Sequence, residues 1–263
     1  MTTVADLSRF LDEFAPTRLA KDWDNVGLLV GDGGQAVERV MTCLTITPAT
    51  AAEAVRRKAQ LVVTHHPLPF RALKRLTTDT TPGQLLLTLI RHGIAVHSPH
   101  TGFDSAERGI NQQLAEGLGL SDIQPLLAKV GETPEIGSGR YGTLPNPLTL
   151  SQVADRLKQF VRVEQLQVVG KPSRKVERVA VACGSAGSFL EPAARAKCDL
   201  LVTGETSFHT CLEAEACGVA LLLPGHYASE RFGVERLAEV IAAKFPGLEC
   251  WASEDERDPL AWL

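Results

Sequence analysis

The sequence lacks any long apolar segment. Its longest apolar runs, such as residues 219–223, are far shorter than the roughly 20 residues that a membrane-spanning helix needs. We therefore expect no membrane partner. Residues 1–14 carry three acidic side chains in an amphipathic pattern, which predicts a helix rather than a signal peptide. The six cysteines form no C-x-x-C pair, so we expect them to be core residues of a cytoplasmic protein in a reducing environment.

No charge of one sign dominates either. The chain has 27 lysines and arginines against 31 aspartates and glutamates, a net charge of -4, and both signs are dispersed. This balance lacks the basic patch of a nucleic-acid-binding protein, so a nucleic-acid partner is not indicated. With 263 residues, 44% of them apolar and 22% charged, the composition is typical of a globular protein with one large or two medium domains.

An internal repeat organises the chain. When the sequence is shifted by 139 positions, residues 26–64 lie over residues 165–203 without a gap, and twelve of the 39 pairs are identical. Average composition would give about two or three identities by chance. Predicted strands alternate with predicted helices in both copies, which favours α/β units. We therefore predict two similar, duplicated α/β domains, divided within the segment 131–147 rich in glycine and proline, so that they span residues 1–130 and 131–263.

Three stretches that each follow a predicted strand carry histidines and carboxylates. They supply His65 and His66, then Asp104, then His226 and Glu230. Ligands gather at the carboxyl ends of strands in α/β proteins, and mixed imidazole and carboxylate ligands suit zinc, iron, manganese or similar divalent ions. We predict two such ions, about 3.5–4 Å apart at the junction of the two domains, with Asp104 and Glu230 as the bridging ligands.

Two further histidines are candidates for catalytic proton transfer or for orienting the ligands, namely His97 and His100. Structural alternatives stand beside these roles. His97 is equally well explained as a strand histidine hydrogen-bonded in the core. An aspartate near a helix start, such as Asp104, is commonly a cap, and Glu230 near the start of a helix is favoured by the helix dipole alone.

The motifs together resemble a known family. Thr64-His65-His66-Pro67, Pro99-His100-Thr101-x-x-Asp104 and Gly225-His226-x-x-Ser229-Glu230 resemble signatures of the Nif-three-like dinuclear metal-centre family, whose members are often named GTP cyclohydrolase 1 type 2 homologues. Trp23-Asp24-Asn25-x-Gly27-Leu28, Gly139-Arg140-x-Gly142 and Thr203-Gly204-Glu205 are similar to further motifs of that family. The resemblance covers nearly the whole chain and departs at Gly102, where asparagine is typical. It implies two related α/β domains, the five metal ligands predicted above and a ring-shaped homohexamer.

Two functions of different classes follow. The first is a metal-dependent hydrolase, GTP cyclohydrolase-like by resemblance, that acts on a nucleotide-like or other phosphorylated or cyclic small-molecule substrate. The alternative is a non-catalytic metal-binding oligomeric adaptor or regulator, in which the metals are structural or sensory. Metal storage or delivery is a third reading. Closed coordination shells without an open position would favour the adaptor over the hydrolase.

Overall fold

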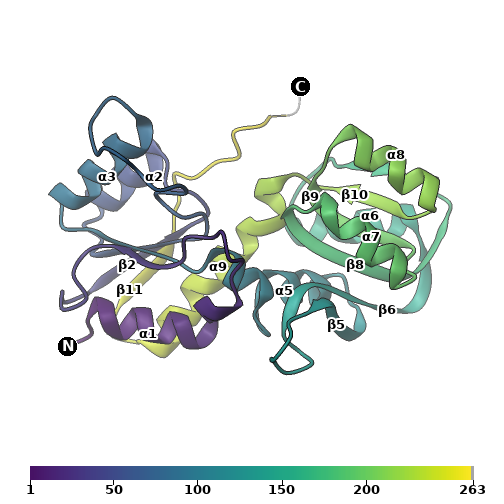
Figure 1. Ribbon diagram of the computed structural model, residues 1–263, viewed down its shortest axis with the longest axis horizontal. Coiled ribbons are helices and arrows are strands. Elements are labelled where there is room, and N and C mark those ends of the chain that lie inside the picture. The colour runs from purple at the N-terminus through teal and green to yellow at the C-terminus, as the bar shows by residue number, and fades with distance from the viewer. Residues whose placement is uncertain (262–263) are drawn as a thin grey trace. The chain divides into compact units, whose positions relative to one another are not determined.

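The computed structural model describes residues 1–261, which divide into two compact units (Figure 1). Unit 1 comprises residues 1–103 and the segment that begins at Gly233, and unit 2 is the continuous segment Asp104–Phe232. The chain passes between the units within two helices, α4 (His100–Ser105) and α9 (His226–Lys244). Over the described part of the chain, we find no helix with the length and apolar character needed to cross a bilayer.

Unit 1 is built on a five-stranded sheet. Its strands are β1 (Gly27–Val30), β2 (Arg39–Cys43), β3 (Leu61–Thr64), β4 (Ala95–Ser98) and β11 (Glu249–Ala252). They lie in the order β1-β4-β3-β2-β11, with β1 antiparallel to β4 and every other pair parallel. The helical segments are α1 (Val4–Phe14), the 3-10 turn η1 (Thr17–Leu19), α2 (Pro48–Arg56) and α3 (Thr81–Arg91). Figure 1 shows α2 and α3 on one side of the sheet and α1 on the other.

Local sequence explains where these elements begin and why the central strands are apolar throughout. Thr3 and Thr47 close capping boxes at the starts of α1 and α2, and Pro48 occupies the first turn of α2, where a missing N–H costs nothing. β3 is buried along its whole length, as expected for a central parallel strand that is covered on both faces. Met41, Val62 and other side chains of one face pack against α2 and α3.

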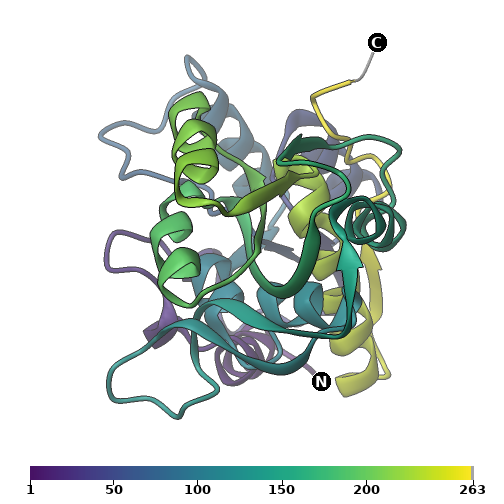
Figure 2. The same cartoon turned by 90° about the vertical axis from the view of Figure 1, so that its right-hand side faces the viewer.

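Unit 2 is built on a six-stranded sheet. Its strands are β5 (Ser121–Ala128), β6 (Gly137–Thr149), β7 (Gln167–Val169), β8 (Lys175–Ser185), β9 (Leu200–Glu205) and β10 (Ala220–Leu223). Its helical segments are α5 (Ile110–Gly117), α6 (Leu150–Val161), η2 (Gly187–Phe189), α7 (Leu190–Arg195) and α8 (Phe208–Cys217). Val179 and Val181 of β8 belong to the core formed with α5 and α6, whereas Ala180 and Ala182 face the core formed with α7 and α8. Figure 2 shows these helices on the two sides of the unit 2 sheet.

The two units repeat one topology, which confirms the predicted fold class of duplicated α/β domains. The order β1-β4-β3-β2 in unit 1 corresponds to β7-β10-β9-β8 in unit 2, each with an antiparallel first pair and parallel pairs after it. The repeat extends to single hydrogen bonds. Gln60 Oε1 accepts the N–H groups of residues 38 and 39, and Asp199 Oδ2, 139 positions later, accepts those of residues 177 and 178.

A glycine recurs at one tight contact in each copy. Gly31 has φ +114° and Gly170 has φ +116°, a conformation that side-chain-bearing residues rarely adopt. A Cβ atom added to Gly31 would lie 2.6 Å from the Cβ of Ala95, and one added to Gly170 would lie 3.2 Å from that of Ala220. The Val-Gly pair found in both copies of the sequence therefore marks the close approach of the antiparallel edge strand to its neighbour.

Two features differ from the sequence-based expectation. The sequence of residues 105–118, which Gly119 follows, is typical of one continuous helix, but α4 ends at Ser105 and α5 begins only at Ile110. The compact units also differ from the division predicted at residues 130 and 131. The segment rich in glycine and proline contains part of the turn after β5 and most of β6, and these two strands pair as a hairpin with Ala128 opposite Gly137. The strand β11, from the end of the described chain, completes the sheet of unit 1.

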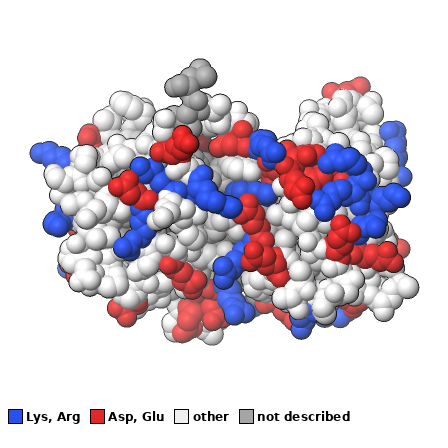
Figure 3. Space-filling view, turned by 180° about the vertical axis from the view of Figure 1, so that it is seen from behind, with Lys and Arg blue, Asp and Glu red and all other residues white. Residues whose placement is uncertain are grey.

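Charged side chains of both signs are interspersed on the face of the molecule in Figure 3. This mixture agrees with the balanced composition and gives that face no field of a single sign.

Candidate metal centre

Two adjacent histidines follow the buried strand β3. The N–H of His65 donates to Cys43 O at 3.0 Å, and that of His66 donates to Leu44 O at 2.8 Å. These bonds extend the pairing of β3 with β2 by two residues beyond the end of the strand, so the backbone of both histidines is held by the sheet. His65 is buried and His66 is partly exposed.

A third histidine comes from the start of α4, just beyond β4. His100 has φ +27°, an unusual value for a residue with a side chain, and its Nδ1 lies 2.7 Å from Asp24 Oδ1. The other carboxylate oxygen of Asp24 accepts the N–H and hydroxyl of Thr101 at 3.1 and 2.5 Å. Burial alone would raise the pKa of Asp24, but the bonds from His100 and Thr101 outweigh it and lower that pKa. An ionised Asp24 thus holds the His100 ring in place.

These three imidazoles form a compact cluster in unit 1. One ring nitrogen from each of His65, His66 and His100 lies within 4.8 Å of the others. The ring centroids of His65 and His66 are 5.2 Å apart, and those of His65 and His100 are 5.1 Å apart. Three convergent imidazoles at the carboxyl edge of a parallel sheet are a ligand set that suits zinc, iron and similar ions. The cluster could therefore hold a metal ion.

A histidine and two glutamates converge in unit 2, where α9 begins. His226 Nε2 lies 3.2 Å from Glu230 Oε2, one helical turn on, and His226 Nδ1 lies 2.9 Å from Glu205 Oε1. Hydrogen bonding to Glu230 is the main cause that raises the pKa of His226 to about 9. Burial opposes it, and the charges of Glu230 and Glu205 reinforce it. A divalent cation could replace the proton between the His226 and Glu230 side chains.

Gly184 lets the end of β8 approach this pair closely. A Cβ atom at Gly184 would lie 2.3 Å from Glu230 Oε1 and 3.3 Å from His226 Nε2. Any other residue would therefore displace the Glu230 carboxylate.

Asp104 lies beside a cysteine in unit 2. Cys183 Sγ donates to Asp104 Oδ1 at 3.3 Å, and Asn111 Nδ2 donates to the carbonyl of Asp104 at 3.1 Å. Burial and the nearby carboxylates of Asp104 and Glu230 raise the pKa of the Cys183 thiol well above its usual value. Cys183 thus remains a neutral thiol that orients Asp104. The concentration of carboxylates in this part of unit 2 favours a cation.

His97, the other predicted catalytic residue, lies within β4 and is 2% exposed. Among residues 1–261, no hydrogen-bond partner is found for its Nδ1. Burial lowers the pKa of His97 to about 4, although the charge of Asp12 opposes that shift. His97 is neutral at physiological pH, and its part in proton transfer stays a prediction.

The depressed pKa of His97 gives a testable pH dependence of stability. The unfolded chain takes up the His97 proton below about pH 6.5, whereas the folded chain does so only near pH 4. The contribution of neutral His97 to the free energy of unfolding is therefore complete above pH 6.5 and is lost as the pH falls toward 4. We expect His97 to account for roughly 2–3 kcal/mol of lost unfolding free energy by pH 4.5. Urea unfolding of chelator-treated wild type and His97→Phe at pH 7 and 4.5 checks this, and equal pH slopes would contradict it.

Asp24 and Glu205 are functional candidates that the residue patterns did not single out. Asp24 follows no buried strand, and only its place in the Trp23-Asp24-Asn25 motif marks it. Glu205 had a clearer signal, because the shift of 139 positions aligns it with His66. Each accepts or shares a hydrogen bond with the Nδ1 of a clustered histidine, at 2.7 and 2.9 Å respectively. Such partners orient the ring, and a proton held on Nδ1 makes Nε2 the metal-binding nitrogen.

The fold and these clusters define a class of protein: a duplicated α/β chain whose strand ends carry histidines and carboxylates suited to divalent cations. The family model described as Duf34/NIF3 (NGG1p interacting factor 3) matches residues 2–259. The chain belongs to this family, which confirms the resemblance seen in its motifs.

Individual relatives agree with this assignment. The chain is 35% identical over 228 residues to a Clostridium acetobutylicum protein named GTP cyclohydrolase 1 type 2 homolog, covering 86% of this chain and 85% of the relative. It is 32% identical over 263 residues to NIF3-like protein 1 of Drosophila melanogaster, covering 98% and 88%. The crystal structure of Staphylococcus aureus protein SA1388 matches with a TM-score of 0.90 at 26% identity, covering 100% of this chain and 99% of that one.

Proposed function

We propose that this protein is a dinuclear metal-dependent hydrolase of a small nucleotide-like, phosphorylated or cyclic substrate. The observation that carries the proposal is the cluster of His65, His66 and His100, whose ring nitrogens converge within 4.8 Å. Buried or half-buried imidazoles gathered this closely repel one another when protonated, so we propose that all three are neutral, with His65 and His66 as metal ligands and His100 beside them.

The proposed centre has the five ligands predicted from the sequence. His65 and His66 would supply imidazoles, and Asp104, His226 and Glu230 would supply two carboxylates and a third imidazole. The two carboxylates would bridge the ions, as a two-metal site requires. Two divalent ions such as zinc, iron or manganese would act as Lewis acids and lower the pKa of a bound water toward neutrality.

His100 is the residue proposed for proton transfer. Asp24 fixes its Nδ1 at 2.7 Å, and a ring nitrogen of His100 lies within 4.8 Å of ring nitrogens of the other two histidines. An imidazole oriented in this way by a carboxylate can accept a proton from a reacting group and return it.

The surroundings of His100 support a planar, anionic substrate. Trp23 and Phe70 are 64% and 50% exposed, and their ring centroids lie 6.1 and 6.0 Å from that of His100. Exposed aromatic rings beside a reactive centre suit stacking with a heterocyclic base. Arg71 and Lys74 are exposed on the loop that follows Phe70 and are suited to a phosphate. The GTP cyclohydrolase name of several relatives points to the same class of ligand.

The alternative function is a non-catalytic metal-binding adaptor or regulator. The description of the family as an interacting factor favours it. A ring-shaped homohexamer, implied by the family resemblance, would serve either function. Turnover against a panel of nucleotides and cyclic phosphodiesters separates the two, because the adaptor would show none with its metals fully loaded.

Elemental analysis tests the metal centre directly. We expect about two divalent ions per chain in protein purified without chelator, and loss of at least one in His65→Ala, since two-metal sites bind through shared ligands. His92→Ala is the matched control, because His92 is exposed and lies outside the cluster. Equal metal content in wild type and His65→Ala would contradict the ligand assignment. Wild type without metal after reconstitution would contradict the centre itself.

A further inference from the structure

A buried glutamate near the end of the described chain holds the loop next to His66. Glu256 is 4% exposed, and its two carboxylate oxygens accept the N–H groups of Leu44 and Thr45 at 2.9 and 2.7 Å. These two residues directly follow β2, at the same edge of the sheet as the histidine cluster. Carboxylate bonds to backbone N–H groups are charge-assisted and strong, so Glu256 determines where this loop lies.

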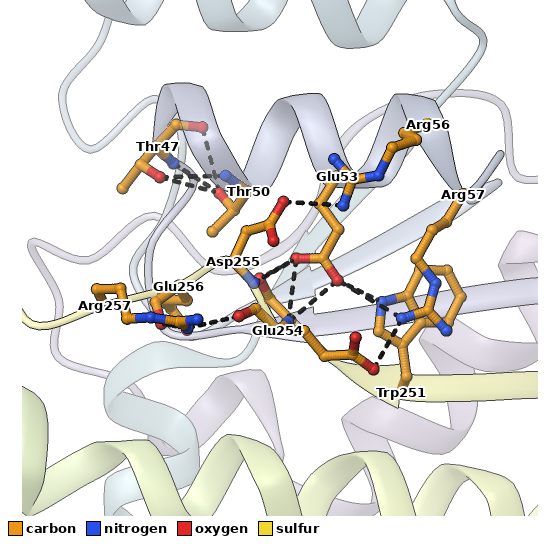
Figure 4. Close-up of polar contacts among 11 residues, drawn as sticks. Thr47, Thr50, Glu53, Arg56, Arg57, Trp251, Glu254, Asp255, Glu256 and Arg257 are labelled. Atoms are coloured by element: carbon orange, nitrogen blue, oxygen red, sulfur yellow. Dashed lines mark hydrogen bonds and ion pairs between the residues drawn. The ribbon is translucent and has the colours of Figure 1, made fainter.

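A separate anchor delivers Glu256 to this position. Residues 251–255 form a strap across α2, bound to the carboxylate of Glu53 (Figure 4). That carboxylate accepts Trp251 Nε1–H at 2.9 Å, the Ser253 hydroxyl at 2.5 Å, and the N–H groups of residues 254 and 255 at 3.1 and 3.0 Å. Because Glu53 holds the strap independently, a substitution of Glu256 removes its two bonds without releasing the segment.

The loop in turn holds a candidate metal ligand. Thr45 Oγ1 lies 2.7 Å from His66 Nδ1. For Nε2 of His66 to bind a metal, Nδ1 must carry the proton and donate it to the Thr45 hydroxyl oxygen. Thr45 therefore holds the ring orientation that His66 needs and can accept its Nδ1 proton, and Glu256 fixes the backbone of Thr45.

In the second copy of the repeat, side chains of other residues bind the N–H groups of the corresponding loop. Cys183 and Gly184 align with Leu44 and Thr45 at the shift of 139 positions. Their N–H groups donate to Asn111 Oδ1 at 2.8 Å and to Ser229 Oγ at 2.9 Å. Asn111 also donates to the Asp104 carbonyl, and the Ser229 hydroxyl donates to the carbonyl of His226. In both units, side chains hold this loop by its N–H groups. A further hydrogen bond to a predicted metal ligand comes from the loop itself in unit 1, through Thr45, and from the holding side chains in unit 2.

We infer that Glu256 is a positioning residue for the metal centre, which acts through Thr45 to hold the His66 ring in the orientation that binds a divalent cation. The inference rests on the metal-binding part of the proposed function and does not depend on hydrolysis. It assigns the strap a role in the metal site as well as in the fold.

Zinc affinity and the absorption spectrum of the cobalt-loaded protein test this inference. The variants are Glu256→Ala and Thr45→Val, with Thr45→Ser as the variant that restores the hydroxyl. Glu254→Ala is the matched control, because its exposed side chain lies on the same strap. We expect Glu256→Ala and Thr45→Val to weaken zinc binding about 10- to 100-fold and to shift the cobalt d–d bands, as loss of the groups that orient a ligand does. Thr45→Ser and Glu254→Ala should resemble wild type.

The possible outcomes are distinct. Wild-type zinc affinity and cobalt bands in both Glu256→Ala and Thr45→Val, with folding verified by circular dichroism, would overturn the inference and leave the metal centre standing. Absence of metal binding in wild type would overturn both. If Glu256→Ala does not fold, Glu256→Gln decides, since it keeps the volume and loses one of the two acceptors. Unchanged affinity and spectrum in that variant would likewise overturn the inference.

Discussion

Replacing Arg140 with methionine is expected to lower the free energy of unfolding by about 3–5 kcal/mol, because several buried carbonyls lose a charged donor at once. Arg140 lies in β6, is 1% exposed, and donates to five backbone carbonyls and to Gln112 Oε1. Methionine fills most of the volume but leaves those carbonyls without their donors. Chemical denaturation followed by circular dichroism measures the loss.

The control for this prediction is Arg195→Met. Arg195 is exposed and pairs at the surface with Glu191, so we expect a change of about 1 kcal/mol or less. Arg140→Lys should be nearly as harmful as Arg140→Met, because one ammonium cannot replace the planar fork of a guanidinium. A lysine variant as stable as wild type would contradict this account. Among the carbonyls that Arg140 binds are those of Ser105 and Ala106, directly after Asp104, so we expect the metal content to fall as well.

Replacing Glu53 with alanine is the second large prediction. The carboxylate is fully buried, and its bonds join α2 to the strap at residues 251–255. Burial would raise the pKa of Glu53, yet the hydrogen bonds from Ser253 and from the N–H groups of the strap outweigh burial and lower it. The ionised form is therefore the one that holds the strap. Its removal leaves several buried donors unsatisfied, and we expect a loss of about 3–5 kcal/mol.

Hydrogen exchange and denaturation together check the Glu53 prediction. The amides of residues 254 and 255 should lose protection in Glu53→Ala, because they donate to its carboxylate. Glu254→Ala serves as the control for an acidic residue of the same region, with an expected change of about 1 kcal/mol or less for its exposed ion pair. Retained protection of both amides in Glu53→Ala would show that other contacts hold the strap.

The duplicated architecture could be predicted because the repeat preserves residues at structurally demanding positions. The Val-Gly pairs at the edge strands and Lys58 and Lys197, both with φ 56°, occupy matching places in the two copies. Pairing between segments distant in sequence could not be predicted in the same way. β11 carries no signal that it would join β2, and no copy of it exists in the repeat.

The bounds of the two compact units could not be predicted from composition. A segment rich in glycine and proline suggests a linker, yet residues 137–149 form β6, because a long hairpin also needs such residues where its strands bend and cross. The compact units change inside the helical segments α4 and α9.

Residues directly beyond strands were the easiest part of the site to predict. The ring nitrogens of three histidines, His65, His66 and His100, converge. This is expected of side chains that follow neighbouring parallel strands. Their supporting residues were harder, because a hydrogen-bond partner such as Asp24 or Glu256 lies far from its histidine in sequence and has no spacing rule to mark it. Among these supporting residues, Glu205 had a sequence signal, because the repeat aligns it with His66.

The order of the chain also has a consequence for its synthesis. Unit 2 is one continuous segment, whereas unit 1 is interrupted by it and completed only by β11 and the strap. Because domains fold as units while the ribosome extends the chain, unit 2 can fold while the first sheet still has an open edge at β2. Glu256 emerges later than both. We therefore expect the loop that holds His66 to become ordered last. Metal binding would then follow the synthesis of unit 2, and the nascent chain would bind no ion before Glu256 is in place.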